Sequence, residues 1–144
     1  WILLSLREIR PKLIITIDSS EYPKLISWIN AMIVRYSLNI ENIGFVNNSE
    51  IHDIYAQSPT IIFPSYFESF GLPLVEGSLY GCDIVAGELD YVRDVCCPNE
   101  TFNPSSENSI FRAILRHLNY DSTIKYKSPE DFMRSISLSY EKKL

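Results

Sequence analysis

Two glutamates, Glu68 and Glu76, have the spacing that first suggests shared chemistry. Seven residues separate them. We predict that Glu68 lies in a loop after a strand and Glu76 in the opening turns of the next helix, so that both carboxylates can flank one pocket. By itself this spacing occurs in many proteins, where acidic residues at a helix start simply interact favourably with the helix dipole. The pair therefore predicts a site only together with the residues around it.

The residues between the glutamates favour an anion at this pocket. Gly71 lets the backbone approach a ligand closely, and Pro73 in the first helical turn lacks only an N–H that has no partner within the helix. The free N–H groups of that turn would face the anion. The same carboxylates could instead form the acid and base of a glycoside hydrolase, whose geometry depends on their separation. A helix start suited to phosphate argues against that alternative.

The elements that must position this pocket follow from the alternation of short apolar runs with longer amphipathic segments. This pattern predicts stacked βα units and an α/β fold with a parallel sheet flanked by helices. The first run is rich in β-branched residues, as is typical of a strand buried on both faces. Ligands bind at the carboxyl ends of such strands, which would bring Asp18, Val46 and the 64–71 loop together. The predicted strands are Leu13–Ile17, Ile43–Val46, Thr60–Phe63, Ile84–Ala86 and Thr101–Asn103.

Helices are predicted between these strands, with polar caps before several of them. Capping oxygens are expected from residues 18–20, 47–49 and 105–106, and Gly81 is expected in a left-handed helix terminus. We predict helices over residues 21–37, 50–57, 72–80, 91–96 and from 106 to 118. The domain organisation that follows has the end of a preceding helix at 1–10, the sheet domain at 11–120, and a hinge and C-terminal helix at 121–144.

Composition restricts the class of protein further. Hydrophobic residues make up 46% and charged residues 22% of the 144 positions, as in a soluble globular domain. The net charge of -5 disfavours nucleic acid as a partner. Three cysteines, Cys82, Cys96 and Cys97, fit neither a disulfide framework nor a zinc site, which favours a reducing cytoplasmic compartment and no metal. The longest apolar runs are too short to span a bilayer.

The longer string around the two glutamates carries a family resemblance. Pro-Ser at 64–65, then Glu-Ser-Phe-Gly-Leu-Pro-Leu-Val-Glu at 68–76, then Gly81, resembles the E-x7-E signature of the retaining GT-B glycosyltransferases of group 1. Residues 89–95, the Phe-Asn-Pro at 102–104 and a helix containing Ile110 also resemble that family. The likeness covers about Pro11 to Leu118. It implies a Rossmann-like C-terminal domain of a GT-B fold that binds a nucleotide-sugar donor.

The resemblance also implies a role for each matching residue. Glu68 matches the catalytic glutamate beside the donor sugar, and Glu76 matches the one that accepts hydrogen bonds from the ribose hydroxyls. The backbone of Phe70, Gly71 and Leu72 would contact the sugar and diphosphate, and Val46 would lie near the base. Transfer would proceed with retention, without a metal or other cofactor, to a glycan or lipid-linked acceptor of a bacterial surface polysaccharide. Peripheral association with the inner face of the membrane would then be compatible with a cytoplasmic enzyme.

Three departures from the family pattern restrict what this chain is expected to do alone. Asp18-Ser19-Ser20 stands where the family has a glycine-rich turn, and Asp83 stands where it often has proline. In the family, an arginine and a lysine usually hold the diphosphate, and they belong to a βα unit that we expect upstream of Trp1. The N-terminal GT-B domain, which binds the acceptor, is also expected upstream. We therefore expect this chain to be inactive by itself. The alternative is a non-catalytic nucleotide-sugar-binding or scaffold domain in a polysaccharide-assembly complex.

Overall fold

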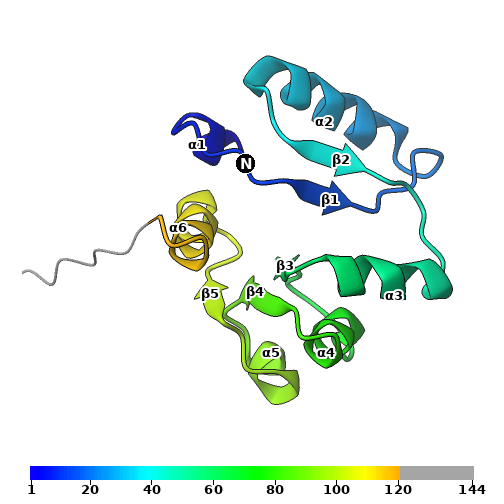
Figure 1. Ribbon diagram of the computed structural model, residues 1–144, viewed down its shortest axis with the longest axis vertical. Coiled ribbons are helices and arrows are strands. Elements are labelled where there is room, and N and C mark those ends of the chain that lie inside the picture. Colours follow the sequence, from blue (N-terminus) through cyan, green and yellow to red (C-terminus); the bar gives the residue numbers. More distant parts are fainter. Residues whose placement is uncertain (121–144) are drawn as a thin grey trace, which may run out of the picture.

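The computed structural model describes residues 1–120 of the 144. Helices and strands alternate along them, and Figure 1 shows their arrangement. The strands are β1 (Leu13–Ile15), β2 (Ile40–Asn42), β3 (Thr60–Phe63), β4 (Asp83–Gly87) and β5 (Glu100–Phe102). The helices are α1 (Ile2–Ser5), α2 (Pro23–Tyr36), α3 (Asn48–Gln57), α4 (Leu72–Leu79), α5 (Asp90–Val95) and α6 (Glu107–His117). The predicted hinge and C-terminal helix at 121–144 lie outside the described residues.

The strands pair in parallel, in two separate sheets. One sheet has the order β1-β2 and the other β3-β4-β5. In Figure 1, β2 and β5 lie at the outer ends, and β1 and β3 lie nearest the middle of the molecule. The predicted α/β class with parallel strands and flanking helices is confirmed, but the described strands form two sheets where one was expected.

The three-stranded sheet is covered on both faces, and neighbouring residues of β3 mark the two sides. Ile61 packs against the cluster of Leu74 from α4, Val92 from α5 and Ile84 from β4. Ile62 packs on the other side, against two clusters that contain Ile114 and Ala113 of α6. Alternate residues of a strand point to opposite faces, so α4 and α5 cover one face and α6 the other. Residues 84–87 of β4 are all buried, and the core lies here.

The two-stranded sheet is much less enclosed, which corrects two predictions. The strand predicted at Leu13–Ile17 to be buried on both faces ends at Ile15, and Ile14 is 37% exposed because none of the described elements covers its side chain. A strand was predicted at Ile43–Val46, but the observed strand, β2, lies just before it at Ile40–Asn42. There the amide of Asn42 pairs with the backbone N and O of Ile17, at 2.9 and 3.0 Å, which ends the ladder.

The segments before α2 and after α1 also differ from the predictions. Asp18 does not cap α2: its carboxylate accepts the Ser20 N–H at 2.7 Å in a tight turn, and Tyr22 is the N-cap. The helix predicted to end near Arg10 ends at Ser5. It closes through bonds from Glu8 N–H to Ser5 O and from Ile9 N–H to Leu4 O, with Glu8 left-handed at φ 62°.

Other local predictions are confirmed. Asn47 forms a full capping box with Glu50 at the start of α3, and Ser106 caps α6 by accepting the Ser109 N–H. Gly81 adopts the left-handed conformation after α4, with φ 74°. Within residues 1–120, no helix is both long and apolar enough to cross a membrane.

Candidate functional site

The loop 64–71 joins β3 to α4 and is tied to α5. The Tyr91 hydroxyl, on α5, donates to the Ser65 carbonyl at 2.7 Å, and the Ser65 hydroxyl donates to the Phe67 carbonyl at 3.2 Å. Burial raises the pKa of Tyr91, and the negative charge of Glu68 adds to the rise. The Tyr91 phenol therefore stays neutral and keeps its proton for the bond that anchors the loop.

Gly71 begins α4 in a conformation that favours glycine. It is the N-cap, with φ 69°, and a Cβ added there would lie 3.3 Å from the Leu74 side chain. Its carbonyl accepts the Leu74 N–H at 2.9 Å. The backbone N–H groups of Phe70, Gly71 and Leu72, by contrast, have no acceptor within residues 1–120. Free N–H donors at a helix start are groups to which proteins commonly bind anions, which makes these three a candidate site.

In the sequence, the two glutamates flank these donors. Glu68 is exposed on the loop, and Glu76 is half-buried on α4. Burial first, and then the charge of Glu76 and a hydrogen bond to it, raise the pKa of Tyr55 to about 12. Tyr55 lies on α3, so α3 brings a phenol near the Glu76 carboxylate.

The apolar side chains of the loop point into solvent. Phe67 is 93% exposed, Phe70 59% and Leu72 57%. Burial of such groups is favourable, so exposed apolar side chains next to free N–H donors make this surface a candidate for contact with a partner. For Phe70 and Leu72, the candidate site would use the backbone N–H and not the side chain.

Val46 is the one predicted site residue that lines either of the two cavities described. It lines a shallow cavity of about 290 Å³ together with Phe45, Glu50 and Asp53, and neither glutamate of the pair borders it. A larger cavity, of about 470 Å³, lies elsewhere, between α1, α2 and α6. It contains none of the predicted site residues.

Sequence reasoning missed Tyr55 and Tyr91 as supports of this site. Both tyrosines were predicted on the correct helices. The residues that they contact, Ser65 for Tyr91 and Glu76 for Tyr55, are distant in sequence. Tyr91 reaches back 26 positions to Ser65. No local sequence pattern predicts contacts between residues so far apart in the sequence. Among residues 1–120, no group of three or more potential ligands could hold a metal ion, and the three cysteines are free.

A match to the family described as Glycosyl transferases group 1 covers residues 20–134. That range contains the whole Glu68 to Glu76 string and every described strand except β1. The chain belongs to the glycosyl transferases of group 1. The predicted family is therefore confirmed at the level of the sequence.

Individual relatives agree with this membership. The chain is 25% identical over 103 residues to O-antigen chain mannosyltransferase B of Escherichia coli, covering 71% of this chain and 27% of that protein. It is 33% identical over 57 residues to an uncharacterized 41.2 kDa protein in the cps region of Klebsiella pneumoniae, covering 40% and 16%. Sucrose-phosphate synthase of Thermosynechococcus elongatus shares the fold, with a TM-score of 0.62, 21% identity, and coverage of 82% and 32%.

Proposed function

We propose that this group 1 glycosyltransferase domain binds a nucleotide-sugar donor at the Glu68 to Glu76 segment, as part of an enzyme that transfers the sugar with retention. The observation that carries the proposal is the run of three free backbone donors between two carboxylates at the start of α4. The E-x7-E string and the family membership support it. The chain spans 27% of the E. coli relative, so the acceptor is bound by parts of the enzyme outside this domain.

Each group of the segment has a defined task in this proposal. The Glu76 carboxylate accepts hydrogen bonds from the ribose hydroxyls, which orients the nucleotide. The N–H groups of residues 70–72 and the positive end of α4 bind the diphosphate oxygens. When the bond between the anomeric carbon and the diphosphate oxygen breaks, these donors stabilise the negative charge left on the nucleotide. No metal is needed for that stabilisation.

Glu68 acts at the sugar side of the same bond. Its exposed carboxylate lies on the loop that precedes the free donors. There it contacts sugar hydroxyls and stabilises the positive charge that develops at the anomeric carbon. The names of the two curated relatives point to a surface polysaccharide as the product and to mannose as the first sugar to test.

Nuclear magnetic resonance on the ¹⁵N-labelled chain tests donor binding directly. We expect GDP-mannose, UDP-glucose or ADP-glucose to shift the backbone N–H signals of Phe70, Gly71 and Leu72 in a saturable way. Glu76→Gln should weaken the responding donor about tenfold to a hundredfold, because hydrogen bonds to a charged acceptor contribute about 1.5–3 kcal/mol. Asp94→Asn, an exposed carboxylate on α5, is the matched control and should leave affinity unchanged.

Two outcomes would contradict the proposal. One is that none of the three donors moves the signals of residues 70–72, while the spectrum shows a folded domain. The other is that Glu76→Gln and Asp94→Asn weaken binding equally. Adding EDTA should not change the affinity, and a loss of binding on chelation would refute the metal-independent mode. A scaffold role would be indicated if the intact protein binds donor tightly but does not turn it over. If the intact protein does turn donor over, Glu68→Gln should reduce the rate greatly.

A further inference from the structure

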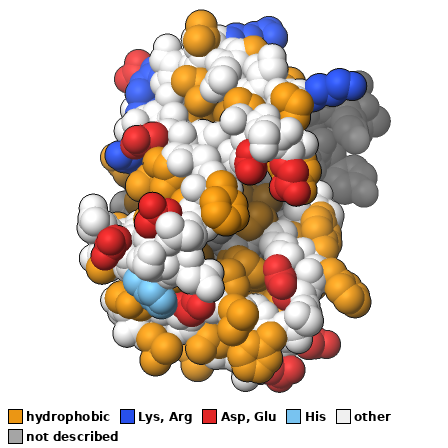
Figure 2. Space-filling model, turned by 90° about the vertical axis from the view of Figure 1, so that its right-hand side faces the viewer, with side chains coloured by type: hydrophobic (Ala, Val, Ile, Leu, Met, Phe, Trp, Pro, Cys, Tyr) orange, Lys and Arg blue, Asp and Glu red, His pale blue; other side chains and the backbone are white. Residues whose placement is uncertain are grey.

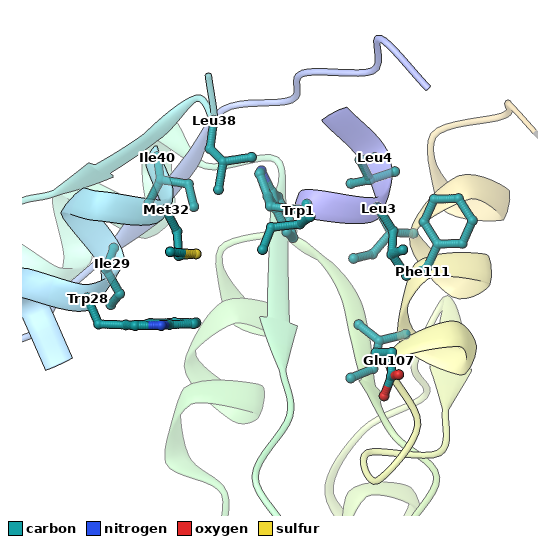
Figure 3. A pocket seen from close by; sticks show the side chains of 13 residues that line it. Trp1, Leu3, Leu4, Trp28, Ile29, Met32, Leu38, Ile40, Glu107 and Phe111 are labelled. Carbon is teal, nitrogen blue, oxygen red and sulfur yellow. The ribbon is translucent and has the colours of Figure 1, made fainter. Parts of the chain in front are cut away.

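The apolar cavity between α1, α2 and α6 and the loop 64–71 offer different groups to a ligand. Figure 2 shows hydrophobic side chains in a hollow of the surface, and Figure 3 shows the side chains that line the cavity. Glu107 is the one charged residue among the 13 that line it. A bound sugar or diphosphate needs hydrogen-bond partners. The loop, which ends in free N–H groups, therefore suits such a ligand better than the cavity does, provided that the loop is held in one conformation.

The loop has little backbone support of its own. Within residues 1–120, no backbone–backbone hydrogen bond outside the helices and strands involves residues 65–70, and all of residues 66–70 are exposed. The bond from the Ser65 hydroxyl to the Phe67 carbonyl lies within the loop. Exposed segments with few backbone bonds open readily unless other groups tie them to the core. The support that keeps Glu68 and the free donors in place therefore comes from outside the loop.

Tyr91 of α5 contacts the loop at both ends. Its hydroxyl donates to the Ser65 carbonyl at 2.7 Å, near the start of the loop. At the other end, a Cβ added to Gly71 would lie 3.8 Å from Cε2 of the Tyr91 ring, so the ring lies against the glycine. The ring also packs against the core cluster that contains Leu74 and Val92. One half-buried side chain thus ties both ends of the loop to the core.

Glu68 lies between these two contacts in the sequence, and its charge acts on the same phenol. Burial first, and then the negative charge of Glu68, raise the pKa of Tyr91. A charge acts on another group in this way when the two are close. The phenol has one proton, which it donates to Ser65. The Glu68 carboxylate therefore lies near Tyr91 without receiving that proton, and its oxygens stay available to a ligand.

We propose that Tyr91 is a positioning residue of the donor site, in which the hydroxyl and the ring have separate tasks. Through Ser65, the hydroxyl holds the part of the loop that carries Glu68. Against Gly71, the ring holds the start of α4 and with it the N–H groups of residues 70–72. Tyr91 acts through the loop and not by contact with the donor. This inference rests on the proposed function, which assigns Glu68 to the sugar and residues 70–72 to the diphosphate.

Two substitutions separate the two tasks. Tyr91→Phe removes the hydroxyl and keeps the ring, so the ¹⁵N-labelled chain should bind the responding donor with an affinity unchanged within about twofold. In the intact protein, the same substitution should lower kcat about threefold to tenfold, which corresponds to the loss of one neutral hydrogen bond. Tyr91→Leu removes hydroxyl and ring, and should also weaken donor binding about tenfold. The spectrum of each labelled variant shows whether it is folded.

A double variant tests whether the hydroxyl acts through Glu68. In a Glu68→Gln background, Tyr91→Phe should lower kcat no further, because the carboxylate that the hydroxyl positions is already absent. A residue that only stabilises the fold would lower kcat by the same factor in both backgrounds. Tyr80→Phe is the matched control, since it removes a hydroxyl at the other end of α4, where the Tyr80 ring lies 5.5 Å from that of His52. It should change neither kcat nor donor affinity.

The parent protein distinguishes failure of this inference from failure of the proposed function. If the parent chain binds no donor through residues 70–72, or the intact protein does not turn donor over, the proposed function fails and the role of Tyr91 with it. If both activities are present, an unchanged kcat in Tyr91→Phe overturns the role of Tyr91 alone. So do equal losses of kcat with and without Glu68, and so do equal losses of kcat and affinity in Tyr91→Phe. If Tyr91→Leu does not fold, the Tyr91→Phe measurements decide.

Discussion

Ile14 and Ile84 have the same side chain in the same kind of parallel strand, yet Ile14 is 37% exposed and Ile84 only 2%. Ile84 lies in β4, which has β3 on one side, β5 on the other, and helices on both faces. Ile14 lies in β1, which has β2 as its one described neighbour. The difference shows that a β-branched apolar run fixes the conformation of a strand, whereas its burial depends on segments that are distant in sequence.

The helices of the two halves differ in the same way. Helix α2 has no fully buried residue along its 14 positions, and its Trp28 is 57% exposed. Helix α6 buries Ala113, Ile114 and Leu115 in 11 positions. Amphipathic helices gain most of their stability from packing their apolar face. We therefore expect the β3–β5 half to be the more stable part of this chain.

The largest expected effect comes from truncating the two isoleucines. Ile84→Ala should lower the free energy of unfolding by about 2–5 kcal/mol, because it leaves a cavity in a packed core. Ile14→Ala should cost less than about 1 kcal/mol in the same chain, since its side chain already contacts water. Urea unfolding followed by circular dichroism measures both. Equal losses of unfolding free energy in the two variants would contradict the difference in burial between Ile14 and Ile84.

Local signals in the sequence predict much of this fold. The capping box at Asn47 and Glu50 and the glycine at position 81 work because the partners lie within one helical turn. The strand Thr60–Phe63 was predicted with its observed bounds, since Pro59 and Pro64 enclose a short β-branched run. The Glu68 to Glu76 string identified the family because many ordered residues match at once.

The remainder could not be predicted from local patterns. The β2 register depends on the Asn42 side chain, which pairs with Ile17 across 25 positions and gives no periodic signal. The apolar run at Ile43–Val46 resembles a strand, but its ladder has already ended, and Gly44 turns the chain with φ 77°. The supports of the site, Tyr55 and Tyr91, act through tertiary contacts that only the folded chain brings together.

A smaller effect is expected at the contact between α4 and β3. A Cβ on Gly77 would lie 1.9 Å from Cδ1 of Ile61 and 3.2 Å from its Cγ1. Gly77→Ala should therefore destabilise the chain by about 1–3 kcal/mol, although alanine is otherwise the better helix former. Ile61→Val removes the colliding Cδ1 atom, so the double variant should regain part of the loss. Additive costs in thermal or urea unfolding would contradict this close approach.

The smallest effect concerns the link between α3 and the candidate site. The pKa of Tyr55 is raised to about 12 by burial, by the charge of Glu76 and by a hydrogen bond to it. Because the folded state favours the neutral phenol, its stabilising contribution is fully present below about pH 10 and is lost as the pH rises toward 12. Phenolate absorbance, as the difference between the parent chain and Tyr55→Phe, measures this ionisation. Glu76→Gln should lower that pKa but leave it above 10, since burial remains.

Glu68→Gln is the matched control for this titration, because Glu68 acts on Tyr91 and not on Tyr55. It should leave the Tyr55 ionisation in place while lowering the pKa of Tyr91. If Glu76→Gln and Glu68→Gln shift Tyr55 alike, the support from α3 is not specific to Glu76. A specific shift would mean that Tyr55 ties α3, the helix that precedes β3 in the chain, to the Glu76 carboxylate of α4, because only a nearby charge can act on one phenol and not on the other.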